Sequence, residues 1–301
     1  MNKQIIRITA CAAIALAALT ACSSDDDKTT NGEGRIPIII SANAEAPTTR
    51  AGQGLQNIQF KKGQDIDVQI TSDDNMTGYD LLTYFTSDNA GTLQPKSGVF
   101  PYYPVNQSPV TIRAIYPTGY MNASSFSVQT ITQARDDAYM ASDLMFAKVT
   151  GQASQPEAVQ LTFEHKMTKI CVNLSKEGGV VLTNATVKLL GVKTSTSFNP
   201  QTGEVTTAGA TGSASDIVMT TNGSDPCAAI IVPQVKSSGY LLEIVLANND
   251  VLHYKTVQDI IFDSGKVYTF NVKVIESNIS VSTTVTNWDT TPDDVEERVK
   301  L

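Results

Sequence analysis

The chain has 301 residues and a formal net charge of −8 at pH 7, with 41% of its residues hydrophobic and 17% charged. This length leaves room for one large or two small domains behind an export signal. An acidic chain without a basic stripe disfavours nucleic acid and anionic lipid surfaces as partners, because both attract clusters of Lys and Arg.

The first 21 residues have the pattern of an export signal. Lys3 and Arg7 give a positive start, and the apolar run that ends at Ala21 is too short to cross a bilayer as a helix. The run closes on Leu-Thr-Ala-Cys, which resembles a bacterial lipobox. An ordinary signal peptide with a chance cysteine is the alternative. We predict a lipoprotein signal peptide over 1–21 and a lipid at Cys22 that holds the precursor at the outer membrane.

A polar tether follows over residues 22–35. Ser-Ser-Asp-Asp-Asp comes directly after Cys22, and the segment has no apolar periodicity, so it has nothing to bury. The acidic run resembles the surface-export signals of Bacteroidetes lipoproteins, and a solvated linker is the alternative. We expect an acidic, flexible connection between the lipid and the folded part of the chain.

Strand patterns dominate the remaining sequence, and no stretch shows three turns of helical period. The alternating apolar residues are Ile36, Ile38 and Ile40; Ile66, Val68 and Ile70; Val110, Ile112, Ala114 and Tyr116; Val159, Leu161 and Phe163; Ile170, Val172 and Leu174; Val187 and Leu189; Leu242, Ile244 and Leu246; Tyr268, Phe270, Val272 and Val274; and Ile279, Val281 and Val285. Gly, Pro, Asn and Asp clusters separate these runs, which is typical of a β-sandwich.

Two local features interrupt the strand pattern. The parity of the apolar residues changes between Phe163 and Ile170, so a turn or bulge is expected at residues 165–168. The best helix candidate is the short segment Gln133–Ala141, with a loop as the alternative.

The polar stretch Thr150–Pro156 is the best candidate for a domain boundary. We predict an N-terminal β-sandwich domain over 36–150, a linker over 151–157 and a C-terminal β-sandwich domain over 158–291. Residues 292–301 would form a tail.

The sequence carries no recognisable catalytic or metal-binding pattern. His165 and His253 lie far apart, and neither has a second His or Cys at metal-ligand spacing. Nucleophile-elbow, P-loop and dinucleotide-binding motifs are absent. Asp73-Asp74 and Asp136-Asp137 lack the Asp/Asn ladder of a calcium loop. We predict no enzyme, no metal and no cofactor, and we interpret both histidines as structural.

Two of the four cysteines remain after export and lipidation. Cys11 leaves with the signal and Cys22 carries the lipid, which leaves Cys171 and Cys227. The compartment permits a disulfide between them, but the sequence does not imply one. Because Cys171 alternates with apolar residues, we favour two unpaired cysteines on strands.

Several stretches match one family in order and spacing. They are Pro47–Ala51, Phe100–Pro104, Val110–Pro117, Asp143–Ala147, Val159–Ile170, Phe198–Val205, Ile231–Gln234, Ser264–Tyr268 and the late Trp288. Behind a lipobox, they make the whole mature chain resemble a Bacteroidales fimbrillin, one of the FimA/Mfa-like lipoprotein pilins. The resemblance implies an all-β fold of two consecutive transthyretin-like Greek-key β-sandwich domains.

The resemblance also implies a maturation step. An Arg-specific protease would cut at Arg50, which with Ala51 matches the family's Thr-Arg pattern, and Arg35 is the alternative site. The cut would release the strand that carries Ile36, Ile38 and Ile40. Its loss would open an apolar groove that a strand of another pilin subunit fills.

A possible donor strand lies near the end of the sequence. Val295, Val299 and Leu301 share one parity, and a solvated tail is the alternative. We therefore expect a structural or accessory pilus subunit at the cell surface. Its expected partners are other pilin subunits, the protease and a host or bacterial adhesion ligand.

The alternative function is a non-polymerising surface lipoprotein that binds glycan or a host ligand. Its stacking surfaces would be Tyr102, Tyr103, Tyr116, Tyr120 and Trp288. A structural role is favoured for Tyr102 and Tyr103, because both lie among prolines in a matched motif. A secreted hydrolase is the least favoured class.

Overall fold

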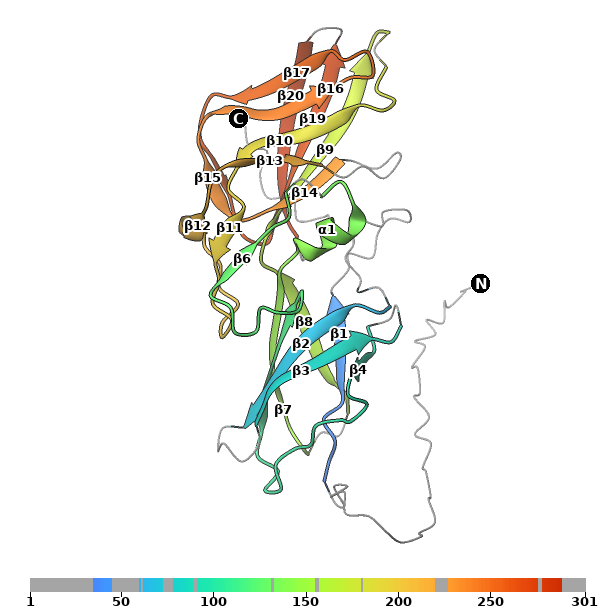
Figure 1. The fold of residues 1–301 in the computed structure, drawn as a ribbon, viewed down its shortest axis with the longest axis vertical. Helices are drawn as coiled ribbons and strands as arrows, with labels where there is room; N and C mark the ends of the chain where they lie inside the picture. The colour runs from blue at the N-terminus through green and yellow to red at the C-terminus, as the bar shows by residue number, and fades with distance from the viewer. Residues whose placement is uncertain are drawn as a thin grey trace, which may run out of the picture. The chain divides into compact units, whose positions relative to one another are not determined.

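The described part of the chain is built almost entirely of β-strands (Figure 1). The computed structural model describes residues 35–44, 60, 62–72, 78–88, 91–130, 133–154, 157–179, 181–219, 227–275 and 278–288. Those residues form twenty strands, one short helix, α1 (Asp136–Ala141), and one 3-10 turn, η1 (Thr207–Gly209). The predicted all-β class is confirmed.

The largest sheet has seven strands and takes up the first strands of the chain. Its order is β1 (Ile40–Ala44), β8 (Val159–His165), β7 (Met145–Gly151), β5 (Val110–Tyr116), β2 (Asp65–Ser72), β3 (Gly78–Thr86) and β4 (Leu93–Pro95). The alternation predicted for β2 is confirmed, because Ile66, Val68 and Ile70 are fully buried. Strand β1 runs parallel to β8, whereas the other neighbours in this sheet are antiparallel.

The later strands form four smaller sheets. One has the order β13 (Ser215–Val218), β10 (Thr186–Val192), β16 (Gly239–Val245) and β17 (Val251–Thr256). Another has the order β14 (Cys227–Ile231), β9 (Thr168–Glu177), β19 (Lys266–Ile275) and β20 (Asn278–Asn287). The remaining strands are β12 (Ala210–Thr211), β11 (Ser195–Ser197) and β6 (Ser125–Ser127) in one sheet, and β15 (Gln234–Lys236) and β18 (Ile260–Phe262) in the last.

The predicted change of parity marks the passage from one sheet to another. Strand β8 ends at His165 in the seven-stranded sheet, and β9 begins at Thr168 in the sheet with β14 and β19. Between them, the N–H of Lys166 donates to the carbonyl oxygen of Leu144 at 2.8 Å, next to the pairing of β8 with β7. A two-residue connection therefore moves the chain between sheets, which confirms the expected turn.

The predicted linker at residues 151–157 connects two strands of a single sheet. Strand β7 ends at Gly151, and β8 begins at Val159 and pairs with it, with Met145 opposite His165. If the chain is divided according to its sheets, the division falls at Lys166–Met167, between β8 and β9. The division into two domains stays a prediction.

Helix α1 is shorter than the predicted segment Gln133–Ala141, and the side chain of Gln133 has another role. It is fully buried, and its carboxamide nitrogen donates to the carbonyl oxygens of Gln129 and Ile230, both at 2.7 Å. Its carboxamide oxygen accepts from the N–H of Ile230 at 2.8 Å. Gln133 thus pairs with β14 as a strand residue would, so helical pattern alone could not place the start of α1.

The turn at residues 199–203 packs on the seven-stranded sheet. Arg113 of β5 donates from Nη1 to the carbonyl oxygen of Pro200 at 2.7 Å. Gly203 has a φ of 73°, and a Cβ atom there would overlap the ring of Phe146 on β7. This position therefore needs glycine for its backbone conformation and for the close contact.

Replacing Gly203 with alanine should lower the free energy of unfolding by about 2–4 kcal/mol, because strain at positive φ adds to an overlap with a packed ring. Chemical denaturation measures the loss. Gly98→Ala is the matched control, since Gly98 has the same φ of 73° and open space around it. Equal losses at the two sites would contradict the contact with Phe146.

Candidate functional site

The first described strand is held by alternate side chains that are buried in the core. Ile38, Ile40 and Ala42 are buried, at 0%, 1% and 2% exposure, whereas Ile39 between them is 41% exposed. Ile36 is partly buried and packs against the same core. Residues 36–42 therefore form an extended segment, which β1 continues from Ile40 onward, and place one of its faces into the protein, as period-2 alternation predicts.

Strand β8 forms one neighbour of this segment. The parallel register places Ile40 opposite Val159 and Ala42 opposite Leu161. The N–H of Val159 donates to the carbonyl oxygen of Ile39 at 2.8 Å. The Ser41 hydroxyl adds a side-chain hydrogen bond to Gln160 Oε1 at 3.1 Å.

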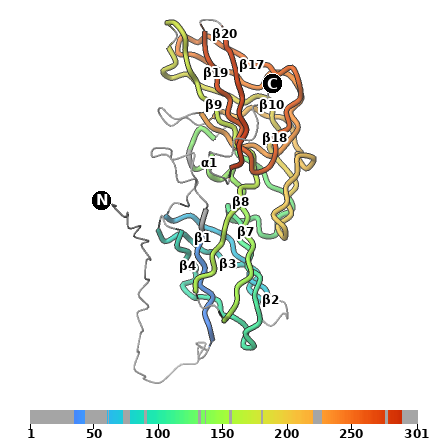
Figure 2. Tube along the Cα trace, turned by 180° about the vertical axis from the view of Figure 1, so that it is seen from behind, coloured from blue at the N-terminus to red at the C-terminus, as the bar shows by residue number. Residues whose placement is uncertain are grey.

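Residues 91–103 form the other neighbour. The N–H of Ile38 donates to the carbonyl oxygen of Pro101 at 2.8 Å, and the N–H of Ala42 donates to that of Gly91 at 2.9 Å. The carbonyl oxygen of Ile36 accepts from the N–H of Tyr103 at 3.0 Å. Figure 2 shows β1 between β4 and β8. We call this seat, between Val159–Phe163 and residues 91–103, the first-strand groove.

The sequence identified the strand but neither of its neighbours. Bridges join Pro37 to Tyr102 and Ser41 to Thr92, both antiparallel. The signal was present in Phe100–Pro104, because prolines favour extended backbone at the edge of a sheet. Since a bridge joins residues far apart in sequence, the pairing itself could not be predicted from that segment alone.

A buried polar cluster lies at the end of β8. His165 is 7% exposed, and its Nδ1 lies 2.9 Å from Oδ1 of the fully buried Asp143. Its ring stacks on Trp288, with centroids 4.1 Å apart and planes 2° apart. The Nζ atom of Lys169 lies 5.6 Å from the Trp288 ring centroid, and burial lowers the pKa of Lys169. His165 is thus a hydrogen-bonded core residue, as interpreted from the sequence.

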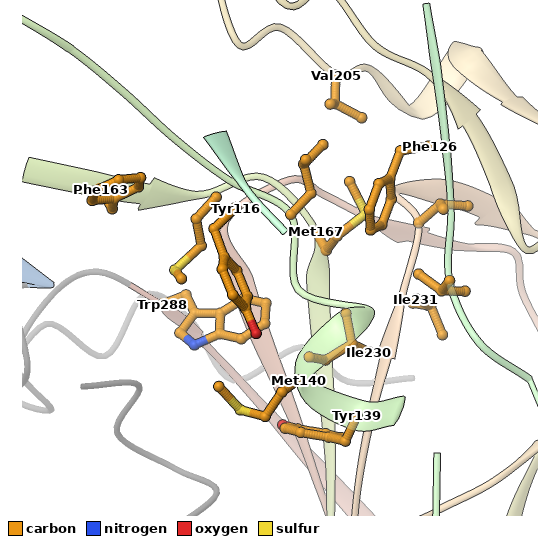
Figure 3. Packing of buried hydrophobic residues seen from close by; sticks show 14 of the residues in the cluster. Tyr116, Phe126, Tyr139, Met140, Phe163, Met167, Val205, Ile230, Ile231 and Trp288 are labelled. Atoms are coloured by element: carbon orange, nitrogen blue, oxygen red, sulfur yellow. The ribbon is translucent and has the colours of Figure 1, made fainter. Parts of the chain in front are cut away.

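Trp288 belongs to the core as well. Figure 3 shows it among buried side chains that include Tyr116, Tyr139 and Met140. Tyr103 and Tyr116 are also buried, at 3% and 7% exposure. Three of the five aromatic residues suggested as glycan platforms are therefore core residues and offer no open ring face.

His253 lies on the surface of β17, within an ion-pair network. Its Nε2 is 3.2 Å from Oε2 of Glu243, and Lys188 Nζ is 2.7 Å from Oε1 of the same carboxylate. The hydrogen bond from Lys188 is the main cause that lowers the pKa of Glu243. His253 is therefore hydrogen-bonded at the surface, where such contacts contribute little to stability.

The described ranges contain neither a metal-binding cluster nor a membrane-spanning helix. No three His, Cys, Asp or Glu side chains gather there as a metal ion would require. Nor does any helix in those ranges have the length and apolar character to span a bilayer. The predicted lipidation residue Cys22, the maturation residues Arg50 and Ala51 and the donor residues Val295, Val299 and Leu301 lie outside the described residues.

Cys171 and Cys227 are buried on neighbouring strands, and neither forms a disulfide. The register places Cys171 opposite Ala228 and Cys227 opposite Val172. Directly opposed residues share a face and successive residues alternate, so the two thiols point to opposite faces of the sheet. This geometry prevents a disulfide and confirms the interpretation that the two cysteines are not bonded to each other.

We expect both thiols to be inert in the folded protein. Burial raises the pKa of Cys227 to about 11, which keeps the unreactive thiol form. A chain without its signal and with Cys22→Ser should show no reaction with a thiol reagent when folded and two free thiols in denaturant without reductant. Absence of free thiols in denaturant would contradict the register.

Comparison with known proteins gives a consistent picture. A family model described as fimbrillin-like matches residues 49–288. Fim1C of Bacteroides uniformis, a candidate fimbrium subunit, is 26% identical to this chain over 302 residues. The match covers 96% of each of the two chains.

Solved structures support the fold. A candidate cell adhesion protein from Bacteroides ovatus has a TM-score of 0.67 at 20% identity, covering 88% of this chain and 100% of that one. A candidate cell adhesion protein from Bacteroides uniformis has a TM-score of 0.66 at 22% identity. That match covers 87% of this chain and 100% of the other. With most of its length matched by the family model, this chain belongs to the fimbrillin-like family.

Proposed function

We propose that this chain is a subunit of a cell-surface pilus, without catalytic activity, that takes part in adhesion. Membership of the fimbrillin-like family supports the pilus role. The proposal extends to its route: export as a precursor acylated at Cys22, cleavage after Arg50 by an Arg-specific protease, and assembly by exchange of the first strand.

The observation that carries the proposal is the first strand, which is hydrogen-bonded along both of its edges. Removing residues 36–44 would leave the N–H groups of Tyr103 and Val159 and the carbonyl oxygens of Gly91 and Pro101 without their present partners. It would also uncover the core beneath Ile38 and Ile40. Open edges and apolar surface of this kind favour pairing with a strand from another chain.

The position of Arg50 suits such a release. The cut would fall after the strand and close to residue 49, where the match to the family model begins. Arg35, in contrast, is exposed and precedes Ile36, so cleavage there would leave the strand in its seat. The two sites therefore lead to different products: an open groove or a closed one.

In this scheme the lipid at Cys22 is a transport handle. It would carry the precursor to the outer surface and leave with the segment that ends at Arg50. A subunit that escapes cleavage would keep both its lipid and its first strand, and would serve as an anchor in the outer membrane.

Arg50→Ala should block maturation. The chain without its signal peptide is treated with an Arg-specific protease, and mass spectrometry gives the cut site. Wild-type product should bind a labelled peptide of residues 35–44, whereas Arg50→Ala should lose at least nine-tenths of this binding because its groove stays filled. An Arg35→Ala control should behave as wild type. Normal cleavage and peptide binding by Arg50→Ala would refute the assigned site.

A further inference from the structure

We propose that the first-strand groove selects a strand with large aliphatic residues at three alternate positions and a small residue at the fourth, supplied by a different subunit and not by a second copy of this chain. The inference rests on the proposed strand exchange and adds the identity of the partner. It follows from the way in which residues 36–42 fill the groove.

Three positions of the groove accept large aliphatic side chains. Ile38 and Ile40 are at most 1% exposed, and Ile36 is partly buried at the end of the segment. A carboxylate at either fully buried position would lose its hydration, which is costly without a compensating charge or hydrogen bonds. An incoming strand must therefore be apolar at these two positions above all.

The fourth position accepts a small side chain. Ala42 is 2% exposed, so a longer side chain there would have to displace packed neighbours. Its backbone also runs close to Gly91, which has a φ of 87° and where a Cβ atom would overlap the carbonyl oxygen of Ala42. The path of the strand is thus narrow at this end.

The outward positions impose fewer demands. Ile39 is 41% exposed, and Ser41 makes a hydrogen bond to Gln160 that is itself exposed. Selection therefore depends on the inward residues, whereas the backbone hydrogen bonds to residues 91–103 and to β8 would serve any extended strand.

The chain's own donor candidate does not meet these demands. Residues 295–301 read Val-Glu-Glu-Arg-Val-Lys-Leu, so Glu297 shares the parity of Val295, Val299 and Leu301. Any register that seats those three apolar residues inward, in either direction, brings Glu297 to the position of Ile38 or Ile40. A second copy would therefore bury a carboxylate in the groove.

A graft in the intact chain tests the groove without cleavage. The tail pattern is introduced as Ile36→Val, Ile38→Glu, Ile40→Val and Ala42→Leu, and a matched graft keeps Ile38. We expect the graft with Glu to melt roughly 10 °C below its matched control, because an unpaired buried charge is strongly destabilising. Failure of only the Glu graft to fold also supports the inference. Melting temperatures within about 2 °C of each other would overturn it.

Peptide binding to the cleaved chain tests the choice of partner. Labelled peptides carry residues 35–44, residues 291–301, or residues 291–301 with Glu297→Val. The first should bind at least tenfold more tightly than the second, and Glu297→Val should recover part of the difference, because Leu301 or Val295 would still occupy the narrow position of Ala42. Equal affinities would overturn the inference alone. No binding by any peptide to a chain cut at Arg50 would overturn strand exchange and, with it, the partner.

Discussion

Replacing Trp288 with alanine is expected to lower the free energy of unfolding by about 4 kcal/mol, as for other large buried aromatic side chains. Trp288 is 5% exposed, and its loss would leave a cavity and remove the stacked partner of His165. The buried ammonium of Lys169 would also lose the ring that it faces. Urea denaturation followed by circular dichroism measures the change.

Tyr240→Ala is the matched control for Trp288→Ala. Tyr240 is 59% exposed, and among the described residues its ring contacts lie at the surface. Its ring centroid is 5.1 Å from that of His253 and 5.9 Å from Nζ of Lys255. Its loss should change the free energy of unfolding by less than about 1 kcal/mol. Comparable losses in the two variants would contradict the core role of Trp288.

The position of Trp288 gives this packing a bearing on assembly. Its partner His165 is the last residue of β8, and the same strand holds the first strand through Val159 and Leu161. The backbone N–H of Trp288 donates to Gly265 at 2.8 Å, which fixes the residue at the end of β20. Trp288 therefore packs at the end of β8, the strand that forms one wall of the groove.

Local alternation predicted the strands well, because burial on one face of a strand leaves a period-2 trace in any short stretch. Ile36, Ile38 and Ile40 show this trace, and the structure buries Ile38 and Ile40 while exposing Ile39. The same trace says nothing about neighbours. That β1 lies between β8 and residues 91–103 follows from contacts between distant segments.

Side-chain chemistry at irregular positions was equally hard to predict. Gln133 falls in a segment with helical pattern but pairs with Ile230 of β14. The polar residues 151–157 connect two paired strands, β7 and β8, and the domain boundary expected there stays a prediction. For Gln133, a partner distant in the sequence decides the structure, and a single sequence contains no record of such a partner.

The second large effect is expected in the groove itself. Ile40→Asp should lower the free energy of unfolding by about 4 kcal/mol or more, because it removes a fully buried aliphatic side chain and buries a carboxylate. Partial release of the strand would relieve that cost. Hydrogen exchange should therefore quicken at the amides of Ile38 and Ala42, which donate to Pro101 and Gly91.

Ile39→Asp is the control that distinguishes the effect of burying a carboxylate from the effect of adding a carboxylate anywhere in the strand. Ile39 precedes Ile40 directly but is 41% exposed, so its carboxylate can stay hydrated and the loss should remain within about 1 kcal/mol. Fast exchange at Ile38 and Ala42 in Ile40→Asp, with slow exchange in Ile39→Asp, would show that inward side chains hold this strand. Slow exchange in both variants would mean that the backbone hydrogen bonds alone hold it, and the groove would then have no means of choosing between donor strands.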